Sequence, residues 1–420
     1  MLIQIKQTNP KYVKKIALFN LGFRPFFLGA SVFAIISITS WMLVYFSVIH
    51  FNPNEFNSNF LNLSTGTAIS VSASQWHAHE MLYGYTMAVV AGFLLTAVKN
   101  WTGIPTLHNK PLVALFALWC AARVFFLFGT AFLIWAAIAD LLFGIMLIFA
   151  VVIPIIKAKQ WAQLAVVAKL ILLWVGNVVF YLACLGILNS GMIYAINGAI
   201  LLFISLILMI GRRVIPFFIE RGVAMPGNGI RVQLKQYKWL DISILVLFVG
   251  LFLNVLFFQF FYLTMAFSWA LFLTNGYRLF NWHSAGLWRV PLLWSLYLSA
   301  WLINVGFFLF GLQALLPSLS ILTLHIFTIG GIGLMTLSMM SRVSLGHTGR
   351  DIRNPSRWLT YMFIGIATSV IFRAIVPMFT SQFYMAWVLF ASVLWCLAFA
   401  VFVWIYTPIL LKPRTDGMFG

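Results

Sequence analysis

The chain has 420 residues, of which 63% are hydrophobic and 8% are charged. Soluble domains carry about 25% charged residues, so this composition excludes a soluble globular protein and predicts a protein that crosses a lipid bilayer many times. The formal net charge of +19 does not indicate nucleic-acid binding, because the Lys and Arg residues are scattered over short connections with no soluble domain to present them.

Apolar segments follow one another along the whole chain and predict a single membrane domain over residues 1–420. Each segment is about long enough to cross a hydrocarbon core of ~30 Å as a helix. The sequence therefore predicts an all-α integral membrane protein, a bundle of about 12 transmembrane helices over residues 25–49, 75–98, 112–129, 131–156, 162–188, 191–211, 240–260, 262–280, 291–315, 318–341, 358–377 and 383–410.

The distribution of Lys and Arg predicts the orientation of these helices. When the connections are assigned alternately to the two sides, 23 of the 26 basic residues fall on the side of the N-terminus and none on the other. The remaining three, Arg123, Lys169 and Arg373, lie inside helices. Because cytoplasmic connections are enriched in Lys and Arg, both termini are predicted to be cytoplasmic and residues 51–74 to lie outside.

A polar cluster opens the second predicted helix, where His77, His79 and Glu80 lie at its outer end. Polar groups lose their hydrating water in an apolar environment, which costs free energy, so a cluster of this kind indicates a functional site. On a helix His77 and His79 diverge by roughly 200°, so either they serve two sites or the helix begins after His77. The alternative is an interfacial cap, with Ser74 as the N-cap and Trp76 as the interface anchor.

A third histidine, His325, lies in the predicted helix 318–341, about 10 Å below its outer end. Imidazole is a common ligand of haem iron and also binds copper and zinc. His77, His79 and His325 are therefore candidate haem or metal ligands, and Glu80 is a candidate proton carrier or partner that orients an imidazole. For His325 the alternative is an ordinary hydrogen bond between helices.

A second polar set lies at the cytoplasmic ends of the helices. Arginine forks bind carboxylate and phosphate groups, and nearby glycines let the backbone approach such anions. An equally good interpretation is positive charge that only fixes topology. The set consists of Arg24, Arg212, His283, Arg342, His347 and Arg350. Inside the membrane, Arg123 and Asp140 lie in adjacent predicted helices and are candidates for an ion pair, because buried ions need partners.

Several stretches together resemble the NnrS family. They are residues 20–27 (NLGFRPFF), 76–81 (WHAHEM), 91–97 (AGFLLTA), 100–103 (NWTG), 211–218 (GRRVIPFF) and 341–350 (SRVSLGHTGR). The resemblance implies a bacterial cytoplasmic-membrane protein with twelve helices that contains haem and copper and is linked to nitric oxide and nitrosative stress. Many members have a histidine shortly after the Pro-Leu-Leu-Trp of the ninth helix, whereas this chain has Tyr297 after residues 291–294.

Two classes of function are compatible with these features. The first is a membrane metalloprotein with b-type haem and copper that binds or reduces nitric oxide in the nitrosative-stress or denitrification response; if it reduces the gas, it is an oxidoreductase similar to a nitric oxide reductase and needs an electron donor. The alternative is a transporter that exports a small or metal-bound, nitrosylated species. Against transport, no pair of Gly- or Pro-broken helices occupies corresponding positions in the two halves.

Overall fold

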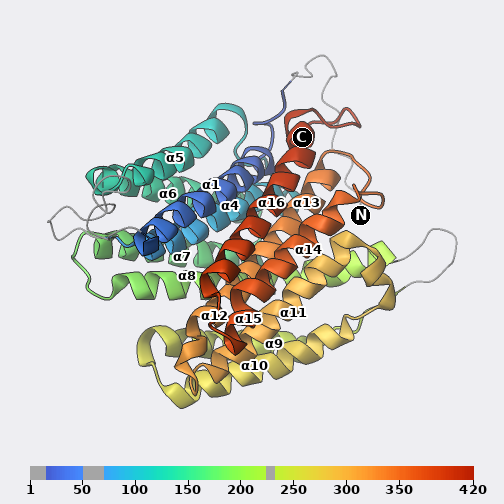
Figure 1. Ribbon diagram of the computed structural model, residues 1–420. Helices are drawn as coiled ribbons and strands as arrows, with labels where there is room; N and C mark the ends of the chain where they lie inside the picture. The colour runs from blue at the N-terminus through green and yellow to red at the C-terminus, as the bar shows by residue number, and fades with distance from the viewer. Residues whose placement is uncertain (1–15, 51–70, 224–231) are drawn as a thin grey trace.

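A computed structural model of the protein describes residues 16–50, 71–223 and 232–420, and within these ranges all regular structure is helical (Figure 1). In lipid a helix satisfies its backbone hydrogen bonds internally, which is why apolar segments of this length fold in this way. The first six passes are α1 (Phe23–His50), α3 (Ala73–His79) continued through η2 (Glu80–Thr86) into α4 (Met87–Thr102), α5 (Asn109–Leu127), α6 (Leu133–Lys157), α7 (Leu164–Cys184) and α8 (Gly191–Val223).

The second half of the chain repeats this pattern of long helices joined by short connections. Its passes are α9 (Lys238–Leu253) with η5 (Asn254–Phe258), α10 (Phe261–Asn281), α11 (Pro291–Leu312), α12 (Ser320–His325) continued through η8 (Ile326–Gly333) into α13 (Leu334–His347), α14 (Trp358–Val370) continued through η9 (Ile371–Ile375) into α15 (Val376–Phe379), and α16 (Tyr384–Leu411).

Among the described residues, 11 helices are long and apolar enough to cross a membrane, which confirms the predicted all-α, multi-pass fold. The helix α10 is less apolar but completes the bundle as a twelfth pass. Its Arg278, near the C-terminus, lies 3.6 Å from Asp241 at the start of α9, so α10 runs back along the full length of α9. The backbone N–H of Ala17 also donates to the carbonyl of Leu411, so the two ends of the bundle sequence meet on one side, as an even number of passes requires.

The two largest extensions beyond a predicted helix end occur in α8 and α13, and both correct the sequence analysis. The helix α8 continues to Val223 because an apolar stretch follows Arg212 and Arg213, so Arg212 lies on a helix and not in a loop. The helix α13 continues to His347, so Arg342 and His347 are also helical. The chain turns only after them, where Gly349 adopts a φ of +73°.

The start of α3 resolves the choice that the sequence left open at His77. Ser72 is the N-cap, and it forms a capping box with Gln75, whose side chain accepts from the Ser72 backbone. The helix therefore begins before His77, with Ser72 and not Ser74 as its cap. His77 and His79 consequently point to different sites.

In the described part of the chain four helices contain a π-helical segment, and three of these segments lie beside a candidate functional residue. The segment η2 follows His79 directly, η8 follows His325 directly, and η9 contains Arg373. A π-helical turn adds a residue to the helical repeat and is often found at functional sites. In this protein the three segments lie at the same end of the bundle.

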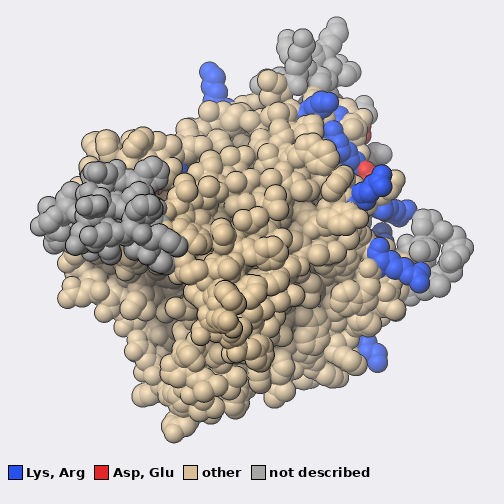
Figure 2. All heavy atoms as spheres, viewed as in Figure 1, with Lys and Arg blue, Asp and Glu red and all other residues tan. Residues whose placement is uncertain are grey.

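The surface separates a basic rim from an apolar belt. In the view of Figure 2 the Lys and Arg side chains gather along the upper and right-hand rim, on the side where α13 and α16 end in Figure 1, and the rest of the visible face is almost free of charge. Large apolar side chains such as Ile242 and Leu273 are more than 60% exposed on the outside of the bundle. This surface fits a multi-pass membrane protein whose basic rim faces the cytoplasm.

This orientation predicts which connections can be labelled from outside the cell. The expected outer connection at residues 51–74 lies mostly outside the described residues, so we choose Ser190, an exposed residue between α7 and α8. A cysteine at Ser190 should react with a membrane-impermeant maleimide on intact cells, whereas one at the exposed Ser356, between α13 and α14, should react only after permeabilisation. Protein without an introduced cysteine is the control, and the reverse pattern would contradict the topology.

Candidate functional site

A cavity of about 340 Å³ lies near the outer end of the bundle, where α1, α3, α8, α12, η9 and α16 converge. This volume falls in the range of about 300–1,000 Å³ that is usual for small-molecule and cofactor sites. Its walls are largely apolar, with side chains such as Ile38, Ile196 and Ile200. Two imidazoles and one guanidinium, from His77, His325 and Arg373, interrupt this apolar lining.

The imidazole of His77 is held at the cavity wall by stacking. Its ring lies on the indole of Trp41, with 4.6 Å between centroids and 27° between planes. The Nδ1 atom of His77 is buried and has no hydrogen-bond partner among the described residues. Buried polar atoms are nearly always paired, so an orphaned ring nitrogen at a cavity fits a group that receives a ligand.

The imidazole of His325 is held by a hydrogen bond to its own helix. Its Nδ1 lies 2.7 Å from the carbonyl oxygen of Ile321, one turn earlier. A carbonyl only accepts, so Nδ1 must carry the hydrogen and Nε2 keeps its lone pair. This is the arrangement in which metal-binding histidines are usually fixed, with the second nitrogen donating to a backbone carbonyl.

The wall of the cavity also contains a thioether, that of Met81. Met81 lies one turn after His77 and also lines the cavity, and its sulfur accepts a hydrogen bond from Ser37 at 3.7 Å. Imidazole and thioether are donors that suit copper(I), and haem iron needs only one or two imidazoles. Within the described ranges, no group of three or more His, Cys, Asp or Glu side chains is placed to hold a metal ion, so a closed all-protein metal cage is not formed there.

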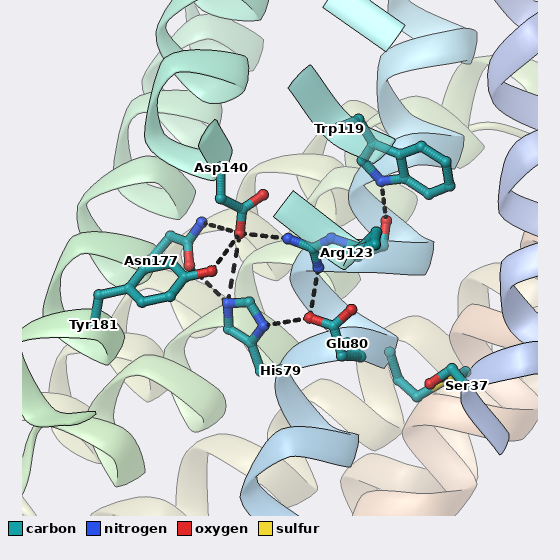
Figure 3. A network of polar contacts seen from close by, with 10 residues as sticks. Ser37, His79, Glu80, Trp119, Arg123, Asp140, Asn177 and Tyr181 are labelled. Atoms are coloured by element: carbon teal, nitrogen blue, oxygen red, sulfur yellow. Dashed lines mark hydrogen bonds and ion pairs between the residues drawn. The ribbon is translucent and has the colours of Figure 1, made fainter. Parts of the chain in front are cut away.

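His79 and Glu80 belong to a different site, a buried network of polar side chains between α3, α5, α6 and α7 (Figure 3). Arg123 donates to Glu80 Oε1 at 2.7 Å and forms an ion pair with Asp140 Oδ2, also at 2.7 Å. The predicted pairing of Arg123 with Asp140 is thereby confirmed. Asn177 and Tyr181 each donate a hydrogen bond to the same Asp140 oxygen, at 3.0 and 3.2 Å.

The hydrogen bonds of His79 define where protons lie in this network. Its Nδ1 is 2.9 Å from Glu80 Oε1 and its Nε2 is 2.9 Å from Asn177 Oδ1. Because the Asn177 amide nitrogen donates to Asp140, its oxygen faces His79 and can only accept. Arg123 keeps the Glu80 oxygen an acceptor as well, so both ring nitrogens of His79 donate. An imidazolium at His79 then balances Arg123, Glu80 and Asp140 to zero net charge.

The three histidines therefore divide between two places. The structure brings His77 and His325 together at the cavity, whereas His79 and Glu80 point into the network. Both ring nitrogens of His79 are engaged, so in this arrangement it has no lone pair to offer a metal. Sequence reasoning did not single out Asn177, Tyr181, Tyr384 or a role for Arg373; a lone polar residue in an apolar helix was the only signal available for each.

At the cytoplasmic end, Arg24 and Arg212 have partners within the protein. The fully buried Arg24 donates to the carbonyl oxygens of Leu410, Lys412 and Gly420 at 2.6–2.8 Å and thus caps α16. Arg212 forms an ion pair of 2.7 Å with Asp241. These contacts use part of the donors of both arginines, and their role as anion-binding residues stays a prediction.

The other members of the cytoplasmic set are less constrained. The guanidinium of Arg342 stacks 3.8 Å above the ring of Phe218, and Arg350 Nη1 is buried without a partner among the described residues. Burial lowers the pKa of Arg350 from its ordinary value.

Two histidines complete the cytoplasmic set. His283 is exposed and accepts a hydrogen bond from Trp288, and His347 packs against Phe23. Beside His347, Arg414 donates to its carbonyl and also to the Asp416 carboxylate. The hydrogen bonding between Arg414 and Asp416 lowers the pKa of Asp416 to about 2. The turn at Gly349 is therefore held by the C-terminal segment.

A comparison with protein families identifies a similarity over most of the chain. A family model described as NnrS protein matches residues 17–414, nearly the whole chain. No curated protein matches the sequence. The matched range includes both the cavity and the buried network.

Proposed function

The chain belongs to the NnrS family, and from this premise we propose that it is a bacterial cytoplasmic-membrane protein that binds haem and copper and that binds or reduces nitric oxide. The observation that carries the proposal is the pair of imidazoles, His77 and His325, at one largely apolar cavity near the outer face. Each keeps a ring nitrogen without a protein hydrogen bond among the described residues.

The residues at the cavity fit the cofactors that the family resemblance implies. A ferrous haem supplies a binding site for a neutral diatomic gas, and copper supplies a second redox centre. His325 would hold the haem iron through Nε2, because its Nδ1 is committed to the Ile321 carbonyl. His77 would serve as a second ligand of the haem iron or, with the thioether of Met81 one turn away, as a copper ligand.

The remaining wall residues favour a small, uncharged substrate. Ile38, Ile196 and Ile200 make this part of the cavity wall apolar, and a neutral gas dissolves in lipid and can enter without a charged path. Reduction of the gas consumes protons, and the network around His79 holds an imidazolium two residues from His77. We propose that His79, paired with Glu80, supplies a proton for this reaction. An electron donor in the membrane would supply the electrons.

The test is the absorption spectrum and metal content of the purified protein, produced in a host that is supplied with haem and copper. We expect a Soret band, iron and copper in stoichiometric amounts, and a shift of the Soret band when nitric oxide is added to the reduced protein. A folded protein that is offered excess haem and shows no Soret band would contradict the proposal. The alternative of an exporter for a metal-bound or nitrosylated species would then be tested in reconstituted vesicles.

A further inference from the structure

Arg373 is a buried cation at the cavity that the proposed function leaves without a role. It lies in the π-helical segment η9, near the outer end of the bundle, and only 8% of its surface is exposed. It lines the same cavity as His77 and His325. A guanidinium at membrane depth is costly unless an anion or several hydrogen-bond acceptors surround it.

The acidic residues that the structure describes are all engaged elsewhere. Glu80 and Asp140 pair with Arg123, Asp241 pairs with Arg212 and Arg278, and Asp416 pairs with Arg414. The other two, Glu220 and Asp351, accept hydrogen bonds from backbone N–H groups. Glu55, the seventh acid of the sequence, lies outside the described residues. No described carboxylate therefore neutralises Arg373.

The hydrogen bonds of Arg373 leave most of its donors unused. Among the described residues its one hydrogen bond runs from Nη1 to the hydroxyl oxygen of Tyr384, at 3.1 Å. Because that oxygen accepts, the Tyr384 O–H can still donate to a third group. Tyr384 lines the same cavity. The Arg373 guanidinium and the Tyr384 hydroxyl thus present several hydrogen-bond donors to the cavity, and no described carboxylate accompanies them.

We propose that Arg373 and Tyr384 form an anion site for a planar group with two oxygen atoms. The flat fork of a guanidinium binds such a group through two parallel N–H···O bonds, and the Tyr384 hydroxyl adds a third donor. Two sources have this chemistry: a propionate of the haem, which rests on the proposed function, or free nitrite, which does not. In either case the anion lies in the same cavity as the two imidazoles and neutralises its buried charge.

The experiment compares purified wild type with Arg373→Gln, Arg373→Lys and Tyr384→Phe. Lys169→Gln is the matched control, because it removes a cation from a membrane helix without touching the cavity. In the first arm, haem-free protein is titrated with nitrite against chloride at equal ionic strength, and the melting temperature is measured. Binding to the folded state raises it.

If nitrite is the ligand, it should raise the melting temperature of the wild type and of Lys169→Gln but not of Arg373→Gln. In the second arm the probes are haem and haem dimethyl ester, which lacks the propionate charges. If a propionate is the ligand, Arg373→Gln should weaken haem binding roughly 10- to 100-fold, the usual loss for a charge-assisted hydrogen bond, and should leave binding of the ester unchanged.

The conservative variants separate anion affinity from folding, because a purely structural role of Arg373 would change only the folding. Arg373→Lys keeps the positive charge but loses the two parallel N–H donors, so it should fold as well as the wild type and keep only part of the anion affinity. Tyr384→Phe removes one donor and should lose less anion affinity than Arg373→Gln. If folded Arg373→Gln matches the wild type in both arms, the anion site does not exist. If no variant or wild type binds haem at all, the proposed function fails, and the nitrite arm still decides the role of Arg373.

Discussion

Replacing His325 with alanine should remove haem from the purified protein, and replacing His77 with alanine should remove haem or copper. Each variant deletes an imidazole whose free nitrogen lines the cavity, and no other described histidine lines it. Loss of an outer partner of a metal ligand already costs about 10- to 100-fold in affinity, so loss of the ligand itself should cost at least about 100-fold. Iron, copper and the Soret absorbance per folded protein are the measurements.

Two other histidines serve as matched controls for these variants. His79→Ala should retain its cofactors in the folded fraction but melt at a lower temperature, because it opens a buried polar network. His283→Ala, at an exposed position, should change neither property. If folded His79→Ala loses haem as completely as His325→Ala, then His79 is a ligand and the network rearranges to free it.

The pattern across variants also separates the two cofactors. If His77→Ala and His325→Ala both lose the Soret band, the two imidazoles share one haem. If His77→Ala keeps haem and loses copper, and Met81→Leu does the same, the copper lies between His77 and Met81, on adjacent turns of one helix. Wild-type haem, iron and copper in both His variants would exclude this cavity as the cofactor site.

The fold could be predicted from the sequence because lipid imposes it on every segment separately. Each pass must be apolar and long enough on its own, and basic residues must stay on one side. The prediction of α8 ended too early, at residue 211, because the charges of Arg212 and Arg213 were taken as the end of the helix. In the structure the apolar face continues to Val223, and Arg212 is neutralised by Asp241. An ion pair with a neighbouring helix therefore allows this helix to continue past a charged residue. The sequence of one segment alone does not show such a pair.

The site was predictable only in part, for a related reason. The spacing along one helix predicted that the side chains of His77 and His79 point in different directions. It could not show which other helices each of them contacts. The meeting of α3 with α12 brings His77 to His325, and the meeting of α3 with α5 and α6 brings Glu80 to Arg123 and Asp140. In addition, the π-helical segments after His79 and His325 shift the helix face by one residue, about 100°, which the period of an ideal α-helix does not predict.

The second large effect is expected at the buried network, where Arg123→Gln should be far more destabilising than Asp140→Asn. With Arg123 removed, Glu80 and Asp140 face a single imidazolium and one negative charge stays uncompensated in the membrane. Removing one member of a buried ion pair costs about 3–5 kcal/mol. With Asp140 replaced by Asn, Arg123 keeps its ion pair with Glu80, and the loss is that of the hydrogen bonds to Asp140, about 1–2 kcal/mol.

The double variant Arg123→Gln with Asp140→Asn tests this charge balance most directly. It leaves Glu80 opposite the His79 imidazolium, 2.9 Å apart in the wild type, so the net charge returns to zero. We therefore expect the double variant to be more stable than Arg123→Gln alone, a coupling of the size seen for residues in one network, about 0.5–3 kcal/mol. Thermal unfolding of all three variants in the same detergent measures it. Equal damage from both single variants, with no recovery in the double variant, would contradict this charge balance and remove the ground for proposing His79 as the proton donor for chemistry in the neighbouring cavity.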